Sequence, residues 1–130
     1  MMNVLVLSNG QLEKREIGTE LEDLQKIVGG HIEVPFLSEV FQENVIDVII
    51  NEEGKFIEGL RPEMAIVDKR NRAILDLVYG NCIFASHDDE GETIGLTEEQ
   101  ERVVEKELST IVGLADKNTM KQFEARVLFI

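Results

Sequence analysis

The sequence predicts an α+β fold, a mainly antiparallel sheet built from hairpins with two or three amphipathic helices. Short apolar runs alternate with turn-forming residues, and two segments carry apolar residues at helical spacing. With 130 residues and 43% hydrophobic composition, the chain has enough apolar surface for one core. We expect a single domain over residues 1–112 and a C-terminal extension over 113–130, docked on the domain or on a neighbouring subunit.

The first thirty residues predict a hairpin followed by a helix. Apolar patterns over 4–7 and 12–17 flank a Ser-Asn-Gly turn, which indicates an opening β-hairpin. Leucine, isoleucine and valine at helical spacing then predict a helix over about 20–28. A capping-box pattern from Thr19 to Glu22 marks its start, and two consecutive glycines mark its end.

The central segment predicts further strands joined by turns. Residues 32–37 have a strand pattern, with Pro35 at an edge or bulge because proline cannot donate to a ladder, and residues 38–43 form a connector. Turn residues indicate two more hairpins, followed by two strands around an acidic turn. The predicted strands are 45–50 with 55–57, 64–67 with 73–78, and then 81–86 and 93–94.

The last third predicts one helix and an ambiguous tail. Thr97 and Gln100 form a second capping box, and apolar residues at helical spacing continue to Ala115, with Gly113 expected to interrupt or end the helix. Residues 120–130 satisfy both helix and strand templates. Their apolar end needs cover from this domain or from a neighbouring subunit, so a homo-oligomer stays open.

Negative charge is concentrated in one part of the chain. The net charge is −13, and residues 88–107 contain nine acidic residues against only Arg102 and Lys106. Such a field repels nucleic acid and membrane surfaces and attracts basic protein surfaces, although a segment of this kind is more often only a solvated turn and the solvent-facing side of a helix. The candidate protein-binding residues are Asp88, Asp89, Glu90, Glu98, Glu101 and Glu105.

One basic cluster gives an alternative. Arg61, Lys69, Arg70 and Arg72 could contact the phosphates of a small nucleotide enclosed between subunits, or decorate a turn. Direct binding of duplex nucleic acid is not expected, because its affinity depends on neutralising many phosphates at once.

Catalytic and metal-binding patterns are weak. Cys82 could pair with His31 or His87, but a lone cysteine in a strand pattern is more typical of a small buried residue. The run from His87 to Glu92 lacks the spacing of a calcium loop. We predict no catalytic residues, no metal and no cofactor. One cysteine and the lack of a secretory or membrane-spanning pattern favour a cytoplasmic location with no membrane association.

Three segments resemble a known family. Residues 21–33 (Leu-Glu-Asp-Leu-Gln-Lys-Ile-Val-Gly-Gly-His-Ile-Glu), 51–55 (Asn-Glu-Glu-Gly-Lys) and 79–82 resemble small phage- and plasmid-borne proteins grouped only as a domain of unknown function. The similarity covers about residues 2–110, and the tail after Gly113 departs from it. The resemblance implies a mobile-element setting and no activity.

Together with the charge pattern, this setting suggests a functional hypothesis. We expect a non-enzymatic accessory protein that binds and inhibits a host factor, in anti-defence, through carboxylates that imitate the phosphates recognised by a nucleic-acid-binding defence enzyme. An oligomeric binder that sequesters a nucleotide immune signal is the alternative. A module of mobile-element replication or recombination that acts only through protein contacts is a third reading.

Overall fold

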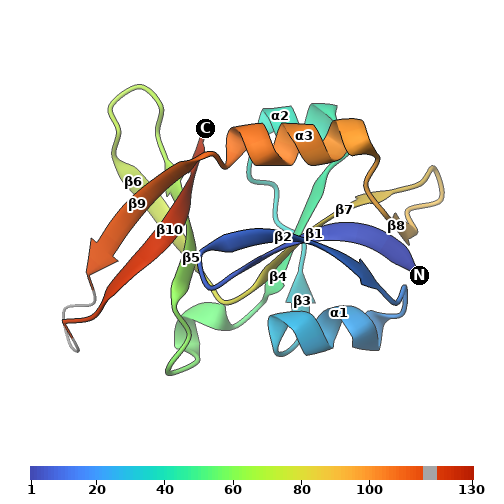
Figure 1. The fold of residues 1–130 in the computed structure, drawn as a ribbon, viewed down its shortest axis with the longest axis horizontal. Coiled ribbons are helices and arrows are strands. Elements are labelled where there is room, and N and C mark those ends of the chain that lie inside the picture. Colours follow the sequence, from blue (N-terminus) through green and yellow to red (C-terminus); the bar gives the residue numbers. More distant parts are fainter. Residues whose placement is uncertain (116–119) are drawn as a thin grey trace.

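The computed structural model describes residues 1–115 and 120–130, and over these residues the strands form two sheets (Figure 1). Sheet 1 has the order β2-β1-β7-β4-β3, with β8 also paired to β7. Its strands are β1 (Met2–Ser8), β2 (Gln11–Ile17), β3 (Ile32–Glu33), β4 (Asp47–Asn51), β7 (Cys82–His87) and β8 (Thr93–Ile94). Sheet 2 has the order β6-β5-β10-β9, with strands β5 (Pro62–Val67), β6 (Ile74–Tyr79), β9 (Thr110–Ala115) and β10 (Gln122–Phe129).

Sheet 1 is covered on both faces by helices. Figure 1 shows α1 (Leu21–Val28) on one side of this sheet and both α2 (Glu39–Glu43) and α3 (Glu98–Glu107) on the other. Alternate residues of β1 therefore enter different clusters: Val4 and Val6 pack on the α1 side, and Leu5 and Leu7 enter the central core. Burial on both faces explains why β1 is a nearly continuous apolar run.

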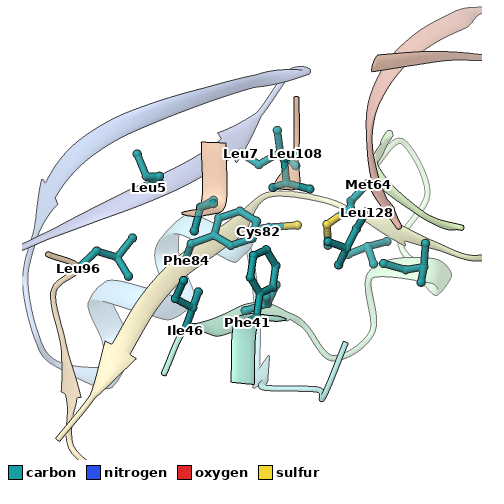
Figure 2. Close-up of a cluster of buried hydrophobic side chains, with 14 residues drawn as sticks. Leu5, Leu7, Phe41, Ile46, Met64, Cys82, Phe84, Leu96, Leu108 and Leu128 are labelled. Carbon is teal, nitrogen blue, oxygen red and sulfur yellow. The ribbon is translucent and has the colours of Figure 1, made fainter. Parts of the chain in front are cut away.

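The central core joins the two sheets and two of the helices (Figure 2). Phe84 from β7 meets Phe41 from α2 edge to face, with ring centroids 6.0 Å apart. Leu108, directly after α3, and Leu128 from β10 are fully buried in the same cluster. Residues far apart in the sequence thus share one core.

Several predictions are confirmed by this arrangement. The fold is α+β with mostly antiparallel pairing, β1 and β2 form the opening hairpin, and β5 and β6 pair antiparallel. The first helix ends where expected, at Gly29, whose φ of 85° is the left-handed conformation that glycine adopts most easily. Its start differs slightly, because Glu20 with Asp23 caps the helix in place of Thr19 with Glu22.

The predicted hairpin between 45–50 and 55–57 is wrong. Residues 54–56 form a 3₁₀ helix, η1, and β4 pairs with β3 and β7. Gly54 lies directly against β6, since a Cβ at this position would be 2.5 Å from the carbonyl oxygen of Tyr79. The Asn51 side chain instead accepts a hydrogen bond from the Glu53 backbone N–H and donates one to the Val28 carbonyl.

Two other central predictions are corrected. Only Ile32 and Glu33 of the predicted strand 32–37 pair with β4. The predicted connector 38–43 contains a short helix, α2, because Ser38 caps it through the Phe41 backbone N–H (3.1 Å) and the Phe41 ring is buried in the core.

The predicted continuation of α3 to Ala115 is also wrong. The helix ends at Glu107, and residues 110–115 form β9. The β-branched run Thr110, Ile111, Val112 suits a strand, and β9 gains β10 as a partner. The ambiguous tail is a strand, since β10 lies between β9 and β5 and pairs in parallel with β5.

The C-terminal extension 113–130 begins inside β9, and its residues 116–119 lie outside the described residues. Val127 and Leu128 of this segment are buried against the rest of the chain.

Candidate protein-binding surface

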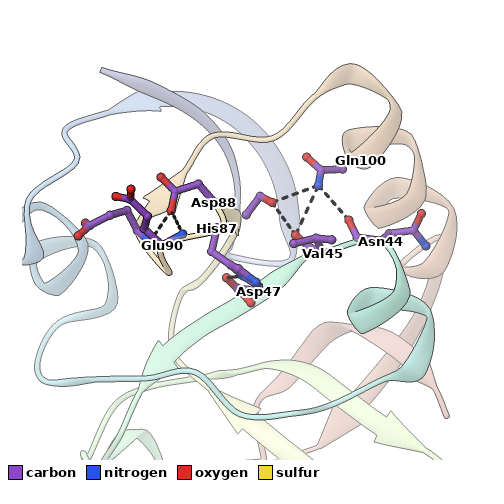
Figure 3. Close-up of polar contacts among 9 residues, drawn as sticks. Asn44, Val45, Asp47, His87, Asp88, Glu90 and Gln100 are labelled. Atoms are coloured by element: carbon purple, nitrogen blue, oxygen red, sulfur yellow. Dashed lines mark hydrogen bonds and ion pairs between the residues drawn. The ribbon is translucent and has the colours of Figure 1, made fainter.

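The acidic turn between β7 and β8 is organised by Asp88. Its carboxylate accepts hydrogen bonds from the backbone N–H groups of Glu90 (3.0 Å) and Glu92 (2.9 Å), as Figure 3 shows for this turn. Asp88 is half-buried by this role, whereas Asp89, Glu90 and Glu92 are exposed. One acidic side chain therefore fixes the turn from which the others project.

The Gln100 side chain connects the start of α3 to the end of β7, the strand that leads into the acidic turn (Figure 3). Its side-chain oxygen accepts the Thr97 backbone N–H at 2.9 Å and completes the predicted capping box. Its amide nitrogen donates to the Asn44 carbonyl at 2.9 Å and lies 3.2 Å from the Ser86 hydroxyl. Because Ser86 stands two residues before Asp88 in the chain, these hydrogen bonds fix the position of the first turn of α3 relative to the acidic turn.

The Val45 carbonyl accepts hydrogen bonds at the same junction, and the backbone of this residue is strained. The Ser86 hydroxyl donates to the Val45 carbonyl at 2.6 Å, and the Gln100 amide lies 3.4 Å from the same oxygen. Val45 has a φ of 55°, in the left-handed region that a β-branched residue rarely adopts. This conformation places the carbonyl groups of Asn44 and Val45 within reach of Gln100.

Charge is distributed unevenly along α3. Residues 88–101 contain seven acidic residues and no basic residue, whereas residues 102–107 contain two of each. Glu98 and Glu99 are exposed in the first helical turn, where a carboxylate also complements the helix dipole. The concentrated charge therefore lies at the end of the molecule that carries the β7–β8 turn (Figure 1). We define the acidic surface as the exposed residues Asp89, Glu90, Glu92, Glu98 and Glu99.

The six predicted residues have different environments. Asp89, Glu90 and Glu98 belong to the acidic surface, and Asp88 supports it from within. Glu101 is turned towards β2, where its carboxylate lies 3.4 Å from the Lys14 ammonium and its side chain is 12% exposed. Glu105 is exposed but lies in the part of α3 where acidic and basic residues balance. The sequence did not single out Glu92 and Glu99 as candidate protein-binding residues, although both belong to the nine acidic residues of 88–107.

Next to the acidic surface, His87 contacts Asp47 with 2.8 Å between Nδ1 and a carboxylate oxygen (Figure 3). No group of three His, Cys, Asp or Glu side chains in the described ranges is arranged to hold a metal ion. The carboxylates here are used for turn formation and for exposed charge.

The four candidate nucleotide-binding cations are not gathered at one place. Arg61 precedes β5, where it approaches Glu63 and donates to the Glu124 carbonyl, whereas the other three lie beyond the opposite end of the strand. Arg70 pairs with Asp68 at 3.5 Å, and the Arg72 guanidinium stacks 5.0 Å from the centre of the Phe129 ring. The arginine side chains already have partners within the chain.

A groove of about 510 Å³ lies between α2, the β5–β6 turn and the end of β10. Phe36, Leu75 and Phe129 contribute apolar surface to it, and Lys69 and Arg70 line it with Glu39 and Glu43. The groove therefore presents charges of both signs around an apolar interior.

Cys82 does not have the environment of a nucleophile. The side chain is fully buried, and this burial, with a smaller contribution from the negative charge of Glu63, raises the pKa of the thiol above its ordinary range. Its Sγ lies 3.6 Å from the Gly80 carbonyl oxygen. A thiol that stays protonated is a poor nucleophile.

Comparison with known proteins identifies a family. A family model described as a domain of unknown function, DUF3846, matches residues 2–109. The chain belongs to the DUF3846 family. No curated protein and no solved structure gives a significant match to it.

The DUF3846 match covers sheet 1, the helices and the β5–β6 hairpin, and it ends directly before β9. It therefore includes the whole acidic surface. No helix among the described residues is long and apolar enough to cross a membrane.

Proposed function

We propose that this DUF3846 protein binds a basic surface of another protein through its acidic surface and thereby inhibits it. The partner is a host factor that binds nucleic acid, and the protein is a non-enzymatic accessory protein of a phage or other mobile element, acting in anti-defence. The mobile-element setting comes from the sequence resemblance, and the binding mode comes from the charge.

One observation carries this proposal: the five exposed carboxylates of the acidic surface lie in a segment without a basic residue. The hydrogen bonds of Asp88 and Gln100 fix the backbone that presents them. Carboxylates held in fixed positions lose less entropy on binding than those of a flexible tail. Such an array suits a Lys- and Arg-rich groove that normally receives phosphates, and long-range attraction accelerates the encounter.

The first experiment compares host-lysate proteins retained by the wild type and by two variants. One variant neutralises the acidic surface by D89N, E90Q, E92Q, E98Q and E99Q. The matched control carries the same change in net charge at five exposed acidic residues elsewhere: E16Q, E22Q, E33Q, E39Q and E43Q. Circular dichroism establishes that both variants are folded.

We expect basic, nucleic-acid-binding proteins to be retained by the wild type and the control and lost from the neutralised variant. High salt should release them, because surface charges are screened. The partner identified in this way is then purified, and its activity is measured with and without each variant. Equal retention or equal inhibition by all three proteins would refute the proposal.

A second candidate function, binding of a small nucleotide, is favoured only by the groove beside Lys69 and Arg70, whose volume is in the range of ligand sites. A thermal-shift panel of cyclic dinucleotides and cyclic ADP-ribose isomers tests it. Stabilisation by one of them that is lost in K69A supports this function, and no shift across the panel counts against it.

A further inference from the structure

The free edge of sheet 2 is formed by β9, whose sequence is Thr-Ile-Val-Gly-Leu-Ala. β10 pairs with one side of this strand, and among the described residues no strand pairs with the other side. The β9–β10 ladder runs through six consecutive residue pairs without a bulge. Exposed edges are normally protected by charge, proline or bulges, because their free N–H and C=O groups can pair with another strand. β9 has none of these protections.

The absence of charge on β9 is unusual in a chain of which 30% of the residues are charged. The strands at the other three sheet ends all carry charge: Glu33 in β3, Asp76 in β6, and four charged residues in β2. Ile111 of β9 is 50% exposed. β9 is therefore the sheet end at which pairing would cover apolar surface without bringing charges together.

We propose that β9 pairs antiparallel with β9 of a second copy of this chain, so that the two four-stranded sheets continue across a two-fold axis. In a register centred on Gly113, this residue lies opposite its own copy, Val112 lies opposite Leu114 of the partner subunit, and Ile111 lies opposite Ala115 of the partner subunit. Every opposing pair is uncharged. A two-fold contact requires that one segment complements itself, and an uncharged strand meets this requirement.

Charge also favours a second copy joined at this edge over one joined elsewhere. Two chains of net charge −13 repel each other, and the repulsion is smallest when their dense charges are far apart. β9 lies at the opposite end of the molecule from the β7–β8 turn and the first turn of α3 (Figure 1). Pairing through β9 leaves both acidic surfaces free, so it is compatible with the proposed function but does not depend on it.

Gly113 provides the test, because a Cβ at this position would meet no atom within 4 Å and its φ is outside the left-handed region. Sedimentation velocity over a wide concentration range compares the wild type, G113A and G113E. We expect a monomer–dimer equilibrium in the wild type and in G113A. G113E should weaken the dimer more than about tenfold, since it places two carboxylates near each other across the axis.

Hydrogen exchange identifies the surface used. In the wild type, the β9 amide groups that point away from β10 should gain protection as the protein concentration rises. In folded G113E they should not. A wild type that stays monomeric at all concentrations overturns the proposal. A dimer that G113E leaves intact, or one that forms without protecting β9, overturns it as well.

Discussion

The carboxylate of Glu63, on β5 of sheet 2, accepts a hydrogen bond of 2.8 Å from the backbone N–H of Gly10, in the β1–β2 turn of sheet 1. It also accepts the Asn9 N–H at 2.9 Å. Its side chain is 1% exposed, and the Arg61 Nε lies 3.4 Å away. Arg126 strengthens the same junction from β10 by donating to the Gly10 carbonyl. A buried charge thus holds the two sheets together.

Replacing Glu63 by Gln should lower the free energy of unfolding by about 2 kcal/mol, because hydrogen bonds to a charged acceptor are lost and an amide N–H₂ is placed against backbone donors. E124Q is the matched control, since Glu124 is exposed and Arg61 contacts its backbone carbonyl, not its side chain. Urea denaturation measures both variants. Equal stability of E63Q and E124Q would show that the junction does not depend on the carboxylate.

The V45G variant should be more stable to unfolding than the V45A variant, which reverses the usual effect of glycine and alanine on protein stability. The φ of 55° disfavours any side chain, and glycine adopts it without a steric penalty. We expect V45G to exceed V45A by about 1 kcal/mol in the free energy of unfolding.

The measurement is chemical denaturation of both variants. A second pair, E16A and E16G, at an exposed residue of β2, serves as the reference in which glycine should be the less stable residue. If V45A proves the more stable member of its pair, the strain at this position has no energetic effect.

Cys82 should be unreactive in the native protein. Since burial raises the pKa of its thiol, the thiol stays protonated at neutral and mildly alkaline pH. Labelling with Ellman's reagent at pH 8 is expected to follow global unfolding. Q42C, which adds an exposed cysteine on α2, should react at once at that added thiol alone. Rapid labelling of the native wild type would mean that the strand opens locally.

The predictable part of the fold was encoded in neighbouring residues. The Asn9-Gly10 turn has φ angles of 53° and 78°, a conformation for which these residue types are preferred, and the hairpin around it follows. The capping box of Thr97 and Gln100 likewise marks the start of α3 from local chemistry alone.

The remaining parts depend on distant partners. Ile111 and Val112 fit the helical spacing of α3, but the helix competes with a β10 ladder that the sequence around β9 does not announce. For the acidic surface, the sequence showed the concentration of acidic residues in one segment. The inward ion pair of Glu101 and the turn-forming role of Asp88 were not, because each depends on which groups the fold places beside the carboxylate.

The β5–β6 turn gives a prediction about pH. The Arg70 backbone N–H, which donates to the Asp68 carboxylate at 2.8 Å, is the main cause that lowers the pKa of Asp68 below its ordinary value of 3.8, and the Arg70 side chain contributes less. A pKa lowered in the folded state means that the ionised carboxylate stabilises the turn above the ordinary pKa, and that this stabilisation is lost as the pH falls through the lower folded value.

Carbon-13 NMR titration of the Asp68 carboxyl group should therefore give a pKa below 3.8 in the wild type. In R70A the pKa should rise only part of the way, since the backbone donor remains. Return of the pKa to its ordinary value in a folded R70A protein would assign the whole effect to the guanidinium and contradict this account.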